Sequence, residues 1–218
     1  MDSIAALLNR HPDLAGIRPE VEGALELLAG TYAADGKVLV CGNGGSAADA
    51  EHIVGELMKS MIVPRPVTGS DRHRIEAAAP ARLASEAGYL AGHLEGALPA
   101  VSLSSQTALI TAIGNDTAGD MIFAQQVYGY GRSGDLLWAI STSGSSRNVV
   151  LAGLAARARG MKVLAMTGDP GEPLGEIADL SIRVPPGNVS EVQQLHQAIY
   201  HWLCAALESR FFDAEPHY

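Results

Sequence analysis

The sequence has few aromatic residues, few basic residues and few cysteines. Aromatic side chains make up only 5% of the 218 residues, so the smaller Ala, Leu, Val and Ile side chains must fill the core, and a hydrophobic content of 47% is enough for a large one. Lys and Arg number 15 against 24 Asp and Glu, which gives a net charge of −9. Because so acidic a chain has no electrostatic footprint for nucleic acid or an anionic membrane, any anionic ligand must be held locally by backbone amides and hydroxyl groups.

Long apolar runs are also missing. No stretch is long enough to cross a membrane, and residues 1–14 lack the basic start and apolar run of a signal peptide. We therefore expect a cytoplasmic protein. The two cysteines are Cys41, which follows an apolar stretch, and Cys204, which lies in a helix-like one, and we expect two buried thiols rather than a disulfide.

Short apolar runs alternate with helix-like segments along the chain. This alternation is typical of a parallel sheet covered by helices, and continuous apolar runs are expected when both faces of a strand are buried. The sequence therefore predicts an α/β protein, a three-layer αβα sandwich around a five-stranded parallel sheet. The expected strands are Lys37–Cys41, Ala100–Ser104, Leu136–Ser141, Lys162–Thr167 and Leu180–Pro185, and the expected helices are Pro19–Ala34, Ser46–Ser60, Thr107–Ile113, Gly119–Tyr128, Arg147–Arg159 and Glu191–Phe212.

The length favours one domain, residues 1–218, that begins with a helical segment at about 1–36. The segment at about 62–98 is different, because it contains Pro64, Pro66 and Pro80, a polar patch and an Ala-rich helical stretch. It is expected to be an insertion that leaves the core. A lid, a subunit contact and a plain surface insertion all remain open for it.

Two loops rich in small and hydroxyl-bearing residues each join a strand to a helix. They are Gly42–Ser46 and Ser141–Asn148, and both lie at the carboxyl ends of strands, where open parallel sheets bind ligands. Free amides at a helix N-terminus favour a phosphate, and Ser and Thr hydroxyls can surround its oxygens. Neither loop has the spacing of a nucleotide P-loop or a complete dinucleotide fingerprint. The sequence thus predicts a phosphate site, with simple capping and turning as the alternative.

The helix after the first loop carries His52 and Glu56, which are four residues apart and therefore share a face. The C-terminal helix offers Gln193 and His201, broadly on one side, while His196 points elsewhere and fits packing better than ligation. Together the first four are a plausible ligand set for a divalent metal such as zinc. A solvated His–Glu pair is the alternative reading.

Several motifs together resemble those of one enzyme family. The run "GNGGSAADAEH" with Glu56 looks like the first signature of bacterial phosphoheptose isomerases, and "STSGSSRNV" is similar to their phosphate loop. "GMKVLAMTG", "RVP" and the spacing from Gln193 to His201 also agree, so the resemblance covers about Val38–Glu208 apart from Ile62–Leu98. It implies a sugar isomerase (SIS) domain of flavodoxin-like fold.

The resemblance also implies a reaction and a site. The reaction would interconvert sedoheptulose 7-phosphate and D-glycero-D-manno-heptose 7-phosphate through a cis-enediol, in a homotetramer whose sites are shared between subunits. One zinc ion per site would be bound by His52, Glu56, Gln193 and His201, with Glu56 and His201 as the acid/base pair. Substrate contacts would come from Asn43, Gly44, Ser46, Asp116, Ser141, Thr142, Ser143, Ser146 and Gln193.

The sequence departs from the family pattern at Ser145, where Asn is usual, and at Ser190, where an acidic residue is common. These departures concern the identity of the sugar more than the type of reaction. Two alternatives remain open. One is a non-catalytic SIS-domain protein that binds the bacterial replication initiator, and such relatives lose the metal and acid/base residues that are present here. The other is an isomerase or sensor for a different sugar phosphate.

Overall fold

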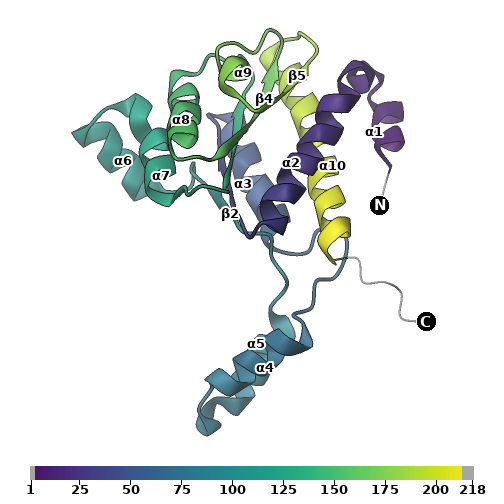
Figure 1. Cartoon of the computed structure of the whole chain (residues 1–218), viewed down its shortest axis with the longest axis vertical. Coiled ribbons are helices and arrows are strands. Elements are labelled where there is room, and N and C mark those ends of the chain that lie inside the picture. Colours follow the sequence, from purple (N-terminus) through teal and green to yellow (C-terminus); the bar gives the residue numbers. More distant parts are fainter. Residues whose placement is uncertain (1–2, 213–218) are drawn as a thin grey trace.

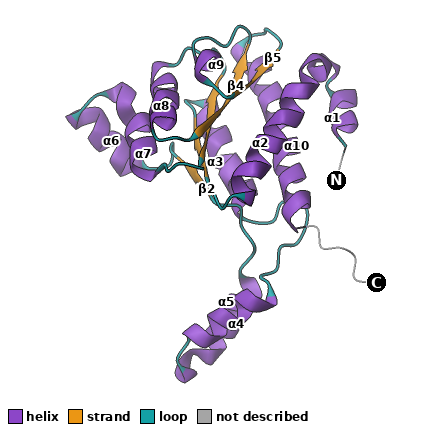
Figure 2. Ribbon diagram, viewed as in Figure 1, coloured by secondary structure: helices purple, strands orange, loops and turns teal. Residues whose placement is uncertain are grey.

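The computed structural model describes residues 3–212, and it confirms the predicted α/β sandwich (Figures 1 and 2). Five strands form one sheet in the order β2-β1-β3-β4-β5, and every neighbouring pair is parallel. This is the flavodoxin-like order, in which the chain reverses its direction of winding beside β1 and β3. The strands are β1 (Val38–Cys41), β2 (Ala100–Ser102), β3 (Leu136–Ser141), β4 (Lys162–Gly168) and β5 (Leu180–Val184).

The helices cover both faces of this sheet. One layer holds α2, α3 and α10, with α1 beside them, and the other holds α7, α8 and α9, with α6 outside (Figure 1). The α-helices are α1 (Ile4–Arg10), α2 (Arg18–Ala33), α3 (Gly45–Met58), α4 (Gly69–Ala78), α5 (Ala84–His93), α6 (Thr107–Asp116), α7 (Ile122–Tyr130), α8 (Arg147–Ala158), α9 (Leu174–Ile177) and α10 (Val189–Phe212). The 3-10 helices η1 (Pro12–Ile17), η2 (Ala81–Leu83) and η3 (Gly119–Met121) lie between them.

Alternate residues of each strand enter two separate cores. Val38 and Val40 of β1 pack toward α2, α3 and α10, whereas Leu39 and Cys41 pack toward α7 and α8. All four residues of β1 are buried, as are all six of β3. This double burial explains why the strands are continuous apolar runs rather than alternating ones.

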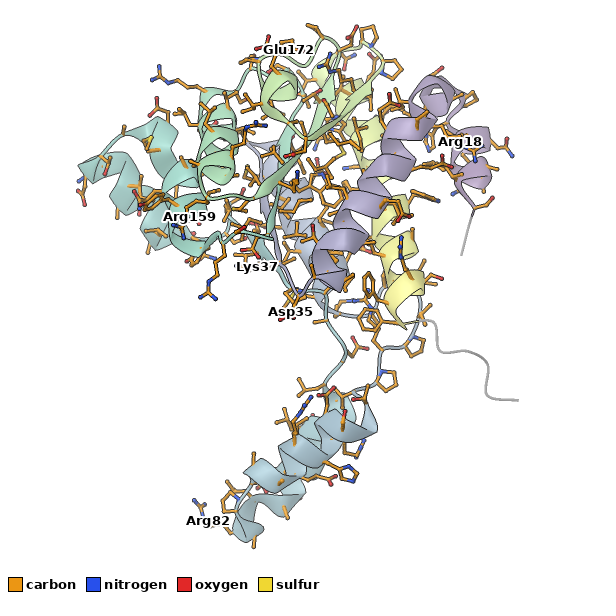
Figure 3. The ribbon with its side chains drawn as sticks, in the orientation of Figure 1. Arg18, Asp35, Lys37, Arg82, Arg159 and Glu172 are labelled. Carbon is orange, nitrogen blue, oxygen red and sulfur yellow. The ribbon has the colours of Figure 1, made fainter. Side chains whose placement is uncertain are left out.

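The segment between α3 and β2 leaves the body as a helical hairpin of α4 and α5, with Arg82 at its tip (Figures 1 and 3). Helix α4 has no buried residue, and α5 buries only Ala87 and Ala91. The two legs of the hairpin meet at its base, where Pro66 and Glu95 form an antiparallel bridge. The hairpin therefore contributes little to either core.

Most predicted elements are confirmed with shifts of one to three residues at their ends. The predicted strand Ala100–Ser104 ends two residues earlier, and the predicted helix at 119–128 begins as the 3-10 turn η3. Both cysteines are free and buried, as expected. Among residues 3–212, no helix is long and apolar enough to span a membrane.

Candidate active site

The two hydroxyl-rich loops lie side by side because β1 and β3 are adjacent strands. Asn43 of the first loop and Asn148 at the start of α8 join them through two reciprocal amide hydrogen bonds of 2.8 Å each. The N-termini of α3 and α8 thus open at the same edge of the sheet. Two helix N-termini supply N–H groups and positive dipole ends to one place, which is a suitable site for a phosphate.

The second loop is shaped by hydrogen bonds between its own hydroxyls. Ser141 Oγ donates to Ser146 Oγ at 3.1 Å, and Ser143 Oγ accepts from the backbone N–H and the hydroxyl of Ser145. Gly144 has a φ of +71°, and a Cβ there would lie 2.2 Å from the backbone of Gly171. The loop conformation therefore requires glycine at this position.

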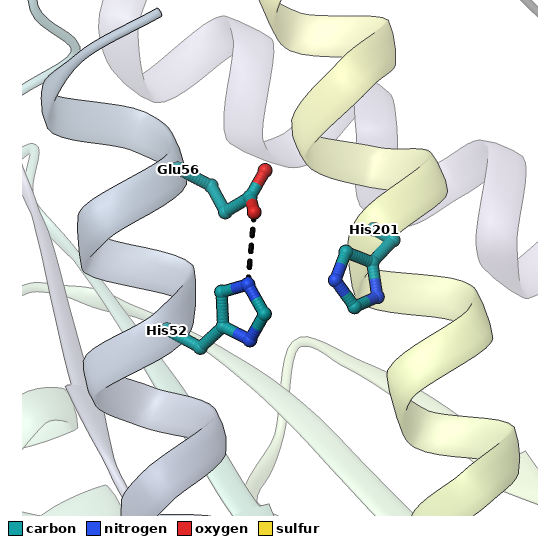
Figure 4. Close-up of side chains that lie close together, drawn as sticks. All are labelled: His52, Glu56 and His201. Atoms are coloured by element: carbon teal, nitrogen blue, oxygen red, sulfur yellow. Dashed lines mark hydrogen bonds and ion pairs between the residues drawn. The ribbon is translucent and has the colours of Figure 1, made fainter. Parts of the chain in front are cut away.

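Three side chains converge farther along α3. His52, Glu56 and His201 each offer a ligand atom within 4.8 Å of the others (Figure 4). His52 Nε2 lies 2.9 Å from Glu56 Oε1, and the rings of His52 and His201 meet edge to face with centroids 4.8 Å apart. By helix rise, His52 lies about 10 Å and Glu56 about 16 Å from the first loop along the axis of α3.

The hydrogen bonds of the two histidines indicate which ring nitrogens face one another. His201 Nδ1 lies 2.7 Å from the carbonyl oxygen of Gln197, so Nδ1 carries a proton, and Nε2 is the nitrogen that can bind a metal. His52 Nδ1 lies 3.3 Å from the hydroxyl of Tyr200, which leaves Nε2 directed at Glu56. Two imidazole nitrogens and a carboxylate then point to one region, as metal ligands do.

The geometry fits a divalent cation in one further respect. Glu56 Oε2 is buried and has no hydrogen-bond partner in the described part of the chain. An unpartnered buried carboxylate oxygen is costly unless a cation or another donor satisfies it. A cation between Glu56 and the two imidazoles would satisfy it.

A buried carboxylate, Asp49, is connected to His52 through the hydroxyl of Tyr200. Asp49 is 2% exposed and accepts hydrogen bonds from Gln193 Nε2 at 3.2 Å, Gln197 Nε2 at 3.4 Å and the Tyr200 hydroxyl at 3.4 Å. Burial raises the pKa of Asp49, and the three donors only partly oppose this shift. Asp49 thereby connects Tyr200, and through it His52, to the glutamine side chains of α10.

The other predicted site residues are placed as follows. Gln193 lies beside Asp49 and Gly45, two turns before His201 on α10, and its Nε2 donates to Asp49 Oδ2. Asp116 lies at the end of α6, where it accepts a hydrogen bond from Asn115 Nδ2. The remaining predicted substrate contacts lie on the two loops: Asn43, Gly44, Ser46, Ser141, Thr142, Ser143 and Ser146. Of these, Ser46 and Ser141 are buried.

Sequence reasoning missed Asp49 and Tyr200. A signal was present, because Asp49 precedes His52 by three residues and Tyr200 adjoins His201, so each was on or next to a predicted ligand face. His196, in contrast, is fully buried, in agreement with a packing role.

A cavity of about 560 Å³ adjoins the group of three at His201. Its walls come from α1, from the segment after α3 and from α10, and they include Arg10, His11, Met61 and Trp202. The group is therefore open on one side in the single chain, and the His52 side chain is 49% exposed.

Known proteins resemble this chain over nearly its whole length. The sequence profile of the SIS domain matches residues 2–70 and 76–168. A phosphoheptose isomerase of Rhodospirillum rubrum is 38% identical over 89% of this chain and 88% of its own, and one of Akkermansia muciniphila is 32% identical over 97% and 96%. The solved phosphoheptose isomerase of Neisseria gonorrhoeae superposes with a TM-score of 0.72 at 32% identity and covers 94% of this chain and 95% of its own.

A second solved phosphoheptose isomerase, from Francisella tularensis, gives a TM-score of 0.73 at 30% identity over 92% of this chain and 91% of its own. The fold, the paired loops and the His–Glu–His group all belong to the regions that these comparisons cover. The chain is a SIS-domain protein and belongs to the phosphoheptose isomerase family.

Proposed function

We propose that this protein is an aldose–ketose isomerase that converts sedoheptulose 7-phosphate to D-glycero-D-manno-heptose 7-phosphate through a cis-enediol. The observation that carries the proposal is that helix α3 begins at the paired loops and bears His52 and Glu56 two to three turns later, opposite His201. One element thus connects an anion site with a group able to bind metal and move protons. The relatives named as phosphoheptose isomerases support the choice of substrate.

Zinc is the metal that we propose for the site, because two imidazoles and a carboxylate are ligands that zinc accepts. When bound, it would act as a Lewis acid on the carbonyl end of the sugar. His52, Glu56 and His201 would bind it within one chain, with Gln193 as a fourth ligand if its amide turns away from Asp49.

Proton transfer is assigned to Glu56 and His201. Glu56 would take the proton from the carbon beside the carbonyl and return it one carbon away. Its Oε1 would do this once His52 turns Nε2 to the metal, while Oε2 binds the cation. His201 would serve the sugar oxygens through Nε2, since Nδ1 is held by the Gln197 carbonyl oxygen and imidazole both donates and accepts protons near neutral pH. It would do so only while Nε2 is not bound to zinc. Neither step needs a redox cofactor.

The phosphate would be held by Ser46, Ser141, Thr142, Ser143 and Ser146, with Asn43, Gly44 and Asp116 toward the sugar hydroxyls. Neither loop contains a lysine, and Arg147 of the second loop pairs with Asp120, so backbone amides and hydroxyls would provide the binding. Binding energy from this remote group would position the reacting carbons.

We further propose a homotetramer with active sites shared between subunits. The half-exposed His52 and the cavity beside His201 leave the metal-binding group open in one chain, and a neighbouring subunit would exclude water from it.

The test is to incubate the purified protein with sedoheptulose 7-phosphate and with five- and six-carbon ketose phosphates, and to follow each mixture by NMR. We expect aldose signals from the seven-carbon substrate and at least tenfold slower conversion of the shorter sugars. An absence of interconversion with every sugar phosphate would reject the proposal. Faster conversion of a shorter sugar would reject the choice of substrate while leaving the reaction type in place.

A further inference from the structure

A buried ion pair, Arg65 with Glu208, adjoins the backbone of Glu56 in the candidate metal site. Arg65 Nε donates to Glu208 Oε1 at 2.8 Å, and the two side chains are 0% and 1% exposed. Glu208 also accepts from three consecutive backbone N–H groups, those of Met61, Ile62 and Val63, at 2.7 to 3.0 Å. Burial acts to raise the pKa of Glu208, but these four donors outweigh it and hold the pKa below its ordinary value. Each group of the pair is thus compensated, as a buried charge must be.

The remaining contacts of Arg65 are with the end of α3. Its Nη1 donates to the carbonyl oxygen of Leu57 at 2.8 Å, and its Nη2 donates to that of Glu56 at 3.0 Å. Carbonyl groups in the last turn of a helix have no partner within the helix, and a cation there also interacts favourably with the helix dipole. Arg65 therefore caps α3 from a position seven residues beyond its last residue.

The same guanidinium connects both helices that carry the metal-binding group. Glu56 is on α3, and its own backbone oxygen is bound by Arg65. His201 is on α10, two turns before Glu208. Arg65 Nε binds the carboxylate of Glu208. Phe212, in the last turn of α10, packs against the guanidinium with 4.6 Å between Cζ and the ring centroid. The planar fork of arginine suits this task, because it directs several donors in fixed directions.

We propose that Arg65 is a positioning residue, which sets the separation of α3 and α10 at the level of Glu56 and His201. Its hydrogen bonds go to Glu208 and to the backbone oxygens of Glu56 and Leu57 rather than to the ligand atoms. It acts through the backbone of Glu56 on one side and through Glu208 on the other. The proposal rests on the proposed metal site for its function, but the placement of Glu56 can be tested without metal.

The experiment compares Arg65→Met and the milder Arg65→Lys with a matched control, Lys37→Met. Lys37 pairs with Asp135 ahead of β1 and β3, at the amino ends of the strands, and both its backbone N–H and its ammonium group donate to that carboxylate rather than to α3 or α10. Loss of either pair destabilises the fold, but only loss of Arg65 should disturb the site. Zinc affinity is measured by competition with a chromogenic chelator, and backbone hydrogen exchange of residues 52–63 is measured in the metal-free proteins.

We expect Arg65→Met to bind zinc at least tenfold more weakly than the wild type and to exchange faster at residues 52–63. Arg65→Lys should lie between the two, because an ammonium group cannot bind Glu208 and both carbonyl oxygens at once. Lys37→Met should bind zinc within about twofold of the wild type. Should Arg65→Met fail to fold, Arg65→Lys carries the comparison.

Equal zinc affinity in the folded Arg65 and Lys37 variants would overturn the proposal. If the wild type binds no zinc, the metal assignment fails, and hydrogen exchange then decides whether Arg65 holds the end of α3. Exchange at residues 52–63 that matches the Lys37→Met control would also overturn it.

Discussion

At the scale of single residues, Glu56 is assigned two roles, metal binding and proton transfer. One of its carboxylate oxygens is 2.9 Å from His52, and the other is buried with no partner in the described chain. A group in this position has one oxygen for a cation and one for a proton. Substitution by glutamine keeps the size of the side chain and one carbonyl oxygen, so it tests the base separately from the ligand.

We predict that Glu56→Gln lowers turnover by about 100-fold or more, the range of general acid–base catalysis. The variant is saturated with zinc, its metal content is verified, and exchange of the sugar's carbon-bound proton with deuterated water is followed by NMR. Glu22→Gln, the same change at an exposed carboxylate of α2 that pairs with Arg18, is the control. Near-normal exchange in zinc-loaded Glu56→Gln would move the proton transfer to His201 or another group.

His196 leads to a prediction about acid stability. The side chain is fully buried on α10, and burial lowers its pKa from 6.5 to about 4. The unfolded chain therefore binds a proton more readily than the folded one between these values, so stability is complete above pH 6.5 and falls as the pH drops toward 4. At pH 5 the expected loss from this residue is about 2 kcal/mol.

The measurement is urea unfolding of the metal-free wild type and of His196→Leu between pH 7.5 and 5. Both proteins share the carboxylates Asp135, Asp179 and Glu208, whose lowered pKa values also reduce stability in acid. The difference between the two curves consequently isolates the histidine. Parallel curves would show that the histidine does not titrate in this window.

At the scale of elements, the α4–α5 hairpin is separable from the rest of the molecule. Its legs are already joined at the base by the Pro66–Glu95 bridge and by the Gly96 N–H, which donates to the Arg65 carbonyl oxygen at 2.6 Å. Beyond this base the hairpin buries almost nothing.

Replacement of residues 68–93 by a tight-turn linker should leave the melting temperature within a few degrees and turnover within about twofold, because it removes little buried apolar surface. A longer deletion that also removes Pro66 and Glu95 is the comparison, and it should lower the melting temperature clearly. Differential scanning calorimetry measures the melting temperatures, and the isomerase assay measures turnover. A large loss of turnover in the shorter deletion would assign the hairpin to the active site or to the subunit contact that completes it.

How far the sequence could predict these elements depended on their burial. The strands were recognisable because both faces of each are covered, which leaves continuous apolar runs such as Leu136–Ser141. Helix α4 has neither an apolar face nor a buried residue, so its polar sequence indicated only a departure from the core. The pairing of His201 with His52 depends on how α10 packs against α3. Periodicity within one helix contains no information about that packing, and the family resemblance supplied it.

At the scale of the whole molecule, the single chain leaves its metal-binding group partly open, and assembly is the natural way to close it. We predict a species of four chains in native mass spectrometry and sedimentation. Turnover per chain should fall on dilution below the dissociation range, because a site completed by a neighbour is lost with it. A monomer with undiminished turnover per chain at nanomolar concentration would contradict the shared site.

The amide pair between Asn43 and Asn148 has a consequence for the chemical ageing of the protein. Asn43 is followed by Gly44, the sequence in which asparagine most readily loses its side-chain amide through attack by the next backbone nitrogen. In the folded chain the side-chain nitrogen of Asn43, Nδ2, donates a hydrogen bond to Asn148 Oδ1 at 2.8 Å, whereas unfolding breaks this bond. Hydrolysis would leave a carboxylate at the mouth of two helix N-termini, where it would compete with the phosphate of the substrate. Each episode of unfolding is therefore a chance of permanent deamidation, and the fraction of altered Asn43 in stored protein would record how often the loops had opened.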